Sequence, residues 1–148
     1  MSDLENVDLT AITPDEFAQL AATTGDDELT QAIHAVGTEA ALTRIFQGFE
    51  ERFVPERAKA TSARIQFVVL DDGDQHRYQV HVHDGVCETS RGEVEDPRVM
   101  LGLGLIDFVK LVTGQAQGPM LFMGGKLKIQ GDLMFASRLM NLFDAPKA

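Results

Sequence analysis

The chain has 148 residues, 44% of them apolar, and a formal net charge of −10. This length suits one domain with a buried core, and the apolar content argues against disorder. No stretch approaches the roughly 18 apolar residues of a membrane-spanning helix. The acidic balance argues against nucleic acid as a partner, because such binding depends on neutralising phosphates, and against charge-driven docking on an anionic membrane.

The charge is unevenly distributed. Residues 1–37 carry eight acids and no Lys or Arg, a net charge of −8, whereas residues 38–148 carry 15 acids and 13 bases, a net charge of −2. We predict from this break that residues 1–37 form an acidic N-terminal helical arm and residues 38–148 the main domain.

Neither end of the chain matches a secretory or a peroxisomal targeting signal. The N-terminus is acidic where a secretory signal needs a basic start, and Pro146-Lys147-Ala148 is not a peroxisomal Ser-Lys-Leu. We therefore expect a cytoplasmic protein. Cys87 is the sole cysteine, so no intramolecular disulfide can form, and we expect it to be a packing residue.

Three helices are expected in the first third of the chain. The first begins at a capping box over Thr13–Glu16. The second runs from about residue 26 to residue 36 and ends at Gly37. The third follows Thr38 with apolar residues at helical spacing, and Pro55 stops it.

The pattern then changes to the alternation that is typical of strands. Strands are expected at residues 63–70, 78–82, 86–91, 99–103 and 126–130, the first three joined by hairpin turns at 71–74 and 84–85. Helices are expected at residues 105–112 and 133–143, with an apolar turn at 120–123. This order predicts an α+β fold, a five-stranded, mostly antiparallel sheet covered on one face by helices.

The last predicted helix, residues 133–143, is apolar nearly all round. Such a helix must be enclosed or must face a second apolar partner, which here could be core, another subunit, a membrane or a bound lipid. Four of the six methionines fall at positions 120, 123, 134 and 140, and Met adapts to irregular space. A well-packed core with Met as filler explains the same pattern.

Two segments resemble the signature end of the sterol carrier protein type 2 family. Residues 108–114 end a helix in Thr-Gly, and residues 121–134 run Gly-Lys-Leu-Lys-Ile through Gly into an apolar helix. The order of elements also matches over residues 39–143. The resemblance implies an apolar tunnel for sterols or acyl chains between the sheet and its helices.

Side-chain direction selects the residues that face this space. We predict that the lining consists of Phe67, Tyr78, Val80, Val82, Leu101, Phe108, Leu111, Val112, Met120, Met123, Phe135, Ser137 and Leu139. Two positions depart from the family pattern. Gly124 stands where many relatives have Gln, and Ser137 where an apolar residue is usual, so its hydroxyl could meet a polar ligand group.

The function expected from this reading is intracellular binding, and transfer, of a fatty acid, acyl thioester or sterol, without catalysis and without a cofactor. The alternatives are a protein-interaction or dimerisation module, or an accessory that presents lipid to a separate enzyme. His81 and His83 share one strand face at a spacing that can bind metal, but Arg77 and Gln79 beside them indicate a solvated surface. No metal site is therefore expected.

The two ends of the chain carry opposite charges. Residues 108–148 hold five bases and two acids, a net charge of +3, against −8 for residues 1–37. This contrast predicts that the arm lies near the final strand and helix, where it could cover the tunnel mouth. The alternative is an acidic, solubilising surface on helices that pack elsewhere.

Overall fold

The computed structural model describes residues 8–144. The helices are α1 Pro14–Thr23, α2 Asp26–Val36, α3 Thr38–Arg52, α4 Pro55–Ala58, α5 Leu105–Val112, α6 Gly118–Met123 and α7 Leu133–Leu139, with a 3-10 turn at Met140–Leu142. The strands are β1 Ala63–Asp71, β2 Asp74–His83, β3 Val86–Arg91, β4 Val99–Gly104 and β5 Leu127–Gly131. The predicted strands and the predicted helices up to α5 are therefore confirmed, with changes in their bounds. Helix α4 was not predicted, α6 replaces the predicted apolar turn, and α7 is shorter than the predicted last helix.

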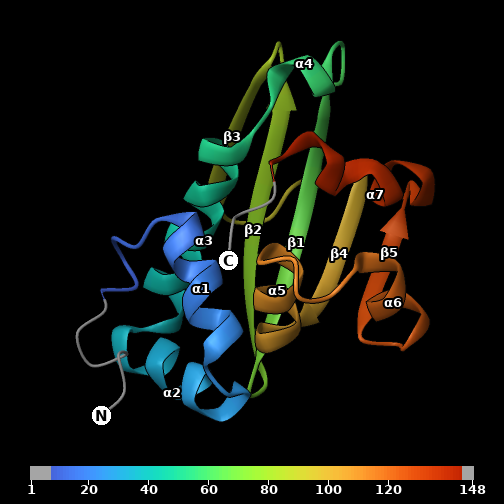
Figure 1. Ribbon diagram of the computed structural model, residues 1–148. Helices are drawn as coiled ribbons and strands as arrows, with labels where there is room; N and C mark the ends of the chain where they lie inside the picture. The colour runs from blue at the N-terminus through green and yellow to red at the C-terminus, as the bar shows by residue number, and fades with distance from the viewer. Residues whose placement is uncertain (1–7, 145–148) are drawn as a thin grey trace.

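The strands form one sheet in the order β3-β2-β1-β4-β5, and helices α1, α2, α3 and α5 cover one of its faces (Figure 1). The pairs β1–β2, β2–β3 and β4–β5 are antiparallel, whereas β1 and β4 are parallel. The predicted α+β class is confirmed. The parallel central pair arises because the chain leaves β3 at the sheet edge and crosses back to β4 in the interior.

An aromatic cluster fills the space between the sheet and the helices. The Phe46 ring of α3 stacks on Tyr78 at a centroid distance of 4.5 Å and on Phe108 at 5.1 Å, and it meets Phe67 edge-on at 5.3 Å. All four side chains are at most 2% exposed. Such pairs add stabilisation beyond their buried area, so this cluster anchors α3 and α5 on the sheet.

The arm begins as predicted. The Thr13 side chain accepts from the Glu16 amide, and Glu16 accepts from the Thr13 amide, which completes the capping box. Gly37, with φ +102°, ends α2 and leads directly into α3. The position of the arm differs from the prediction, because α1 and α2 lie against α3 and α5 rather than beside β5 and α7 (Figure 1).

The C-terminal segment departs from the predicted single helix over residues 133–143. The α-helix ends at Leu139, the chain tightens into the 3-10 turn, and Phe143 is extended. Phe143 forms a β-bridge with Phe53, and the Val54 amide donates to the Leu142 carbonyl at 2.9 Å. These backbone bonds to the end of α3 require an extended chain, which ends the helix early.

Gln66 is a buried polar residue on the sheet face that points away from the helices. Its amide nitrogen donates to the carbonyls of Tyr78 and Gly92, and its amide oxygen accepts from the Val94 amide. The connection between β3 and β4 therefore covers this part of the sheet. Within residues 8–144, no helix combines the length and apolar character needed to cross a bilayer.

Candidate functional site

Ten of the thirteen residues predicted to line a tunnel are buried. They are Phe67, Tyr78, Val80, Val82, Leu101, Phe108, Leu111, Val112, Phe135 and Leu139. All ten belong to one continuous apolar core between the sheet and the helices. The structure therefore brings these ten residues together between the sheet and its helices, as predicted.

The other three predicted residues are exposed. Met120 is 71% exposed and Met123 is 86% exposed, so neither contributes to an enclosed wall here. Ser137 is also exposed, and its hydroxyl donates to the Met134 carbonyl at 2.7 Å. That hydroxyl is satisfied by its own helix rather than directed at a polar group in the core.

The space between sheet and helices is filled with side chains. The aromatic cluster around Phe46 occupies the part where the strands meet α3 and α5, and Phe49 extends it to Phe143 at 5.0 Å. Each of the three pockets described below touches the predicted lining at one residue only, either Val112 or Tyr78. The apolar tunnel that the resemblance implied is thus not shown as an open space, and the sequence pattern did not separate tunnel wall from core.

Apolar surface gathers on α6 and α7. Of the eight large apolar side chains that are exposed within residues 8–144, five lie on these two short helices. They are Met120, Phe122, Met123, Leu133 and Met134, which we call the apolar ridge. Exposed apolar surface of this kind marks an interaction site more often than scattered single residues do.

Buried residues of the same helices connect the ridge to the core. Leu121 of α6 and Phe135 and Leu139 of α7 are each at most 7% exposed and belong to the core cluster. Helices α6 and α7 flank β5 at the edge of the sheet (Figure 1). Each helix therefore has one apolar face in the core and one in solvent, which explains why residues 133–139 are apolar nearly all round.

Glycines shape the turn after α6. Gly125 has φ +75°, which favours glycine, and the Lys126 amide then returns to the Leu121 carbonyl at 2.9 Å. A Cβ at Gly124 would stand 3.3 Å from the Met120 carbonyl oxygen. A side chain at this position would thus press on the last turn of α6.

Asp132 anchors the start of α7. Its side chain accepts from the Phe135 amide at 2.9 Å and from Arg98 Nε at 3.1 Å. These hydrogen bonds, the Phe135 amide first, hold the pKa of Asp132 below its ordinary value. The Arg98 guanidinium also lies 4.1 Å from the centre of the Phe135 ring, which ties α7 to the loop before β4.

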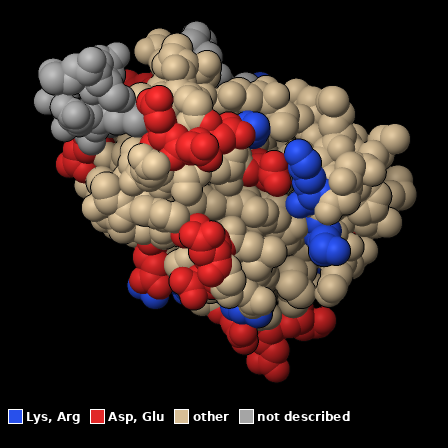
Figure 2. All heavy atoms as spheres, turned by 90° about the horizontal axis from the view of Figure 1, so that it is seen from below, with Lys and Arg blue, Asp and Glu red and all other residues tan. Residues whose placement is uncertain are grey.

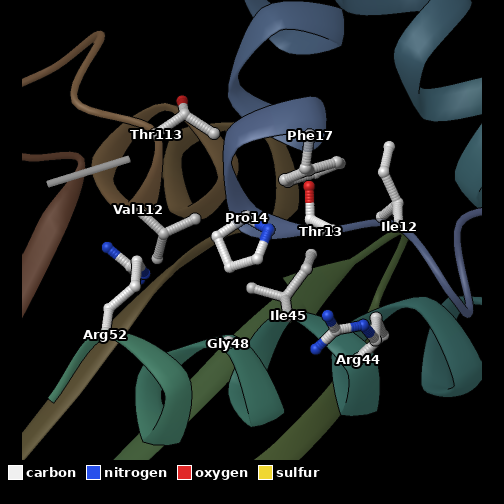
Figure 3. Close-up of a pocket in the computed structure, with 10 residues that line it drawn as sticks. All are labelled: Ile12, Thr13, Pro14, Phe17, Arg44, Ile45, Gly48, Arg52, Val112 and Thr113. Carbon is white, nitrogen blue, oxygen red and sulfur yellow. The ribbon is translucent and has the colours of Figure 1, made fainter. Parts of the chain in front are cut away.

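A small pocket lies where the arm meets α3 and α5 (Figure 3). Its volume is about 30 Å³, room for about one water molecule. The lining includes Pro14 and Phe17 from the arm, Ile45 and Arg52 from α3, and Val112 from α5. The contact of α1 with α3 and α5 is therefore largely apolar and leaves little free space.

Arg52 brings a partly buried charge to this pocket. Its Nη1 donates to the Asp144 carbonyl at 3.2 Å, whereas its buried Nε has no hydrogen-bond partner. Burial lowers the pKa of Arg52, and the nearby carboxylates Asp15, Glu51 and Asp144 oppose that shift. These acids balance the charge of the guanidinium.

Two larger hollows are polar. One, of about 540 Å³, lies between α3 and β3, and the other, of about 320 Å³, lies beside it and shares Tyr78 and Arg91. The first contains Glu50, which accepts hydrogen bonds from the Thr89 amide and hydroxyl. Burying charged groups against a lipid chain is costly, so neither hollow suits an apolar ligand.

Cys87 is a packing residue, as expected. It is 7% exposed, and burial raises the pKa of its thiol to about 12. The thiol is thus protonated at neutral pH and is a poor nucleophile.

A five-stranded mixed sheet with helices on one face, and a surplus of apolar surface on its last two helices, defines an α+β domain of the sterol-carrier type. The chain belongs to the SCP-2 sterol transfer family, whose family model matches residues 42–144. Family and fold together support lipid binding or transfer. The arm, residues 1–37, lies outside the matched segment.

Solved structures agree on the fold. Sterol carrier protein 2 from Yarrowia lipolytica in its apo form is 23% identical, with a TM-score of 0.56, over 71% of this chain and 88% of that one. Palmitated SCP2L2 from Aedes aegypti is 16% identical, with a TM-score of 0.59, over 70% of this chain and 95% of that one. The sec-alkylsulfatase Pisa1 from Pseudomonas sp. is 16% identical, with a TM-score of 0.63, over 69% of this chain but only 16% of its own length.

Among curated proteins, hydroxysteroid dehydrogenase-like protein 2 from Xenopus tropicalis is 31% identical over 99 residues, which cover 66% of this chain. The match spans 24% of the length of that relative. The oleate-induced peroxisomal protein POX18 from Candida maltosa is 44% identical over 45 residues, which cover 30% of this chain and 35% of that one.

Proposed function

We propose that this protein binds one lipid molecule between its sheet and helices α5–α7 and transfers it, without catalysing a reaction on it. The observation that carries the proposal is the apolar ridge, which joins an exposed surface to the buried core through Leu121, Phe135 and Leu139. A ridge of this kind can meet a membrane or a lipid on its outer side and release the lipid to the inner side.

Lipid access requires α6 and α7 to move, because the core beneath them is closed. The two helices have six and seven residues, and helices of this length are marginal without tertiary contacts. Gly118 begins α6, and Gly124 and Gly125 follow it, so glycines give both ends of the helix backbone freedom. We infer that α6 and α7 swing away from α5 and β4 to admit a chain, while the sheet and α3 stay in place.

The energetics favour such binding without a charged anchor. Burying about 14 methylene groups contributes at most ~11 kcal/mol at ~0.8 kcal/mol each. Immobilising the ligand and opening the helices costs several kcal/mol. The remainder is enough for binding in the micromolar range, so apolar contact alone explains the function.

The ligand we propose is a single acyl chain, as a fatty acid or acyl thioester, with a sterol as the bulkier alternative. The relative solved in its palmitated form supports the acyl chain. The test is displacement of a fluorescent fatty acid from purified protein by unlabelled fatty acid, acyl thioester and sterol. The proposal fails if the folded protein shows no saturable binding and carries no lipid in native mass spectrometry.

A second candidate function uses the same ridge as a docking surface for a second copy of the chain or for a separate enzyme. It is favoured by the relatives in which the matching segment is part of a longer chain, two of them named as a dehydrogenase-like protein and a sulfatase. Light scattering after size-exclusion chromatography distinguishes the candidates. A monomer that binds lipid supports the carrier, and a lipid-free dimer supports docking.

We further propose that the protein works in the cytoplasm or in peroxisomes. The second location is suggested by the relative named as a peroxisomal protein. A fluorescent fusion imaged with markers of both compartments tests the assignment, and an exclusively mitochondrial or secreted signal would contradict it.

A further inference from the structure

We propose that His81, His83 and Glu88 form a binding site for a divalent transition-metal ion, best represented by Zn²⁺, on the sheet face that points away from the helices. The inference concerns a different surface from the lipid site and does not depend on it. It also differs from the expectation that no metal site is present, because that expectation rested on His81 and His83 without Glu88.

The three side chains meet because of the strand register. His81 and His83 are two residues apart on β2 and share one face, and their rings stack at a centroid distance of 4.1 Å. Glu88 on β3 pairs directly with His81 across the strands. One ligand atom from each of the three residues lies within 4.8 Å of the other two.

This donor set matches the chemistry of zinc. Zinc sites with an open position commonly have three protein ligands, and two histidines with one glutamate are among the known sets. Metal–ligand distances near 2.1 Å in a tetrahedron place the ligand atoms about 3.4 Å apart. Small side-chain rotations on an open strand surface would adjust the present spacing, which includes widening the 2.5 Å contact between His83 and Glu88, and a water molecule would complete the shell.

Asp84 supports the orientation of the His83 ring. The His83 Nε2 atom lies 2.5 Å from Glu88 Oε1, and its Nδ1 lies 3.3 Å from Asp84 Oδ2. A metal-binding histidine usually donates its second ring N–H to a carboxylate or carbonyl, which fixes the tautomer and the direction of the ring. Asp84 occupies the position of such a partner, so His83 Nε2, which now contacts Glu88, is the ring nitrogen that would bind a metal ion together with Glu88.

Arg64 opposes metal binding at this site through its positive charge. It pairs with His81 from β1, and its positive charge disfavours a cation at this face. The Arg64 residue is exposed, so its side chain can extend into solvent when an ion binds. Asp84 and Glu88 offset that charge from the other side of the histidines.

A bound ion would join β2 to β3, which is the edge strand of the sheet. An edge strand presents unpaired backbone groups and is held by a single neighbour. Metal coordination from both strands would add a cross-link there, and it would stabilise the folded state by an amount that rises with the logarithm of the free metal concentration above its Kd.

The test is calorimetric titration of ZnCl₂ into the full-length protein, at neutral pH and with any purification tag removed. One ion per chain is expected to bind. His81→Ala and His83→Ala should each weaken binding at least about tenfold, and Asp84→Asn should weaken it by about tenfold. Glu88→Gln should also weaken binding, and Arg64→Gln should strengthen it.

Two matched controls locate the ion. Gln79→Ala changes the same face of β2, and His34→Ala removes the other histidine cluster, in which His34 lies near Asp71 and Asp72. Both should leave the affinity unchanged. With Co²⁺ in place of Zn²⁺, a visible absorption band should appear in the native protein and in both controls, but not in His83→Ala.

Three results would overturn the proposal. They are the absence of saturable binding in the folded protein, unchanged affinity in the double variant His81→Ala/His83→Ala, and loss of binding in His34→Ala. Circular dichroism confirms that each variant is folded before its affinity is compared.

Discussion

At the scale of single residues, two glycines that look alike in the sequence have opposite requirements. Gly131 has φ +106°, and a Cβ there would stand 2.5 Å from the Arg98 carbonyl oxygen. Gly48 lies inside α3, where a Cβ would meet only Pro14 of the arm, at an ordinary 3.5 Å. The turn after β5 therefore needs glycine, whereas α3 does not.

We expect Gly131→Ala to destabilise the protein by about 2 kcal/mol or more, because the cost of the strained backbone and the cost of the steric clash add up. Gly48→Ala should stabilise it by up to ~1 kcal/mol, since alanine favours the helix interior. Thermal unfolding of both variants checks the pair. A lower melting temperature for Gly48→Ala would show that the contact with Pro14 tolerates no added methyl group.

Burial of individual residues was only partly predictable. Alternation along β2 correctly placed Tyr78, Val80 and Val82 against the helices, because a strand has only two faces. Met120 and Met123 were predicted at the site but are exposed, since a helical pattern does not say which apolar face finds a partner. Gln66 was missed, because its burial depends on the connection between β3 and β4, which the local pattern does not describe.

At the scale of elements, α7 depends on its N-cap. Asp132 both accepts from the Phe135 amide and pairs with Arg98. Its pKa is depressed in the folded protein, so its stabilising contribution is present above the ordinary value of 3.8 and is lost as the pH falls through the lower folded value. The start of α7 should fray under acid conditions before the sheet opens.

We predict that Asp132→Ala increases hydrogen exchange of the α7 amides from Phe135 to Leu139, with little change in β1 and β2. Asp132→Asn is the matched control, because it keeps a cap acceptor while removing the charge that faces Arg98. It should give an intermediate rate. Equal rates in the native protein and in Asp132→Ala would mean that tertiary contacts alone hold α7.

The apolar ridge makes a second prediction at this scale. Met123 and Met134 are 86% and 76% exposed, so replacing each with Glu should leave the fold intact. If the ridge contacts membranes or lipid, each change should slow lipid transfer between vesicles by about tenfold, the equivalent of ~1.5 kcal/mol of lost apolar contact. Transfer is measured with a fluorescent lipid and acceptor vesicles.

Val86→Glu provides the comparison, because Val86 is an exposed apolar residue, 46% exposed, on β3 rather than on the ridge. Its transfer rate should match that of the native protein. A similar loss of transfer rate in all three variants would point to a general effect of added negative charge. An unchanged rate in both ridge variants would show that the ridge takes no part in transfer.

Pairing between elements was less predictable than the elements themselves. The hairpins β1–β2 and β2–β3 follow from short turns, which fix neighbours and direction. The parallel pairing of β1 with β4 joins two strands between which β2 and β3 intervene in the chain, and no local turn fixes that pairing. The early end of α7 depends on Phe53, 90 residues before Phe143, and no local pattern contains that contact.

At the scale of the whole molecule, charge alone gave the wrong neighbour for the arm. The arm carries −8 and residues 108–148 carry +3, yet α1 and α2 pack on α3 and α5. Figure 2 shows acidic side chains over the arm side and several Lys and Arg side chains toward the α6 side. The Lys110–Asp26 ion pair, at 3.1 Å, is one contact between an acid of the arm and a base of residues 108–148.

Apolar contacts explain the placement. Phe17, Leu20, Leu29 and Ile33 of the arm are at most 9% exposed, and Ile33 is fully buried. Burying such side chains contributes about 1.5–3 kcal/mol each, whereas an exposed ion pair contributes at most ~1 kcal/mol and is screened by salt. The arm therefore sits where its apolar stripes find partners, and charge has a minor influence.

From this position we predict that the arm limits lipid exchange. It covers α5, whose other face belongs to the core that the lipid would enter, so removing it should loosen α5 and speed lipid exchange. We predict faster exchange in a variant that lacks residues 1–37, and a smaller increase in the same direction for Phe17→Ala, which leaves α2 in place. Because apolar contacts hold the arm, the difference from the native protein should persist at high salt.

The exchange rate is measured with a fluorescent fatty acid, at low and high salt, in variants shown to be folded. Rates equal to those of the native chain under both conditions would leave the arm a purely structural part of the core.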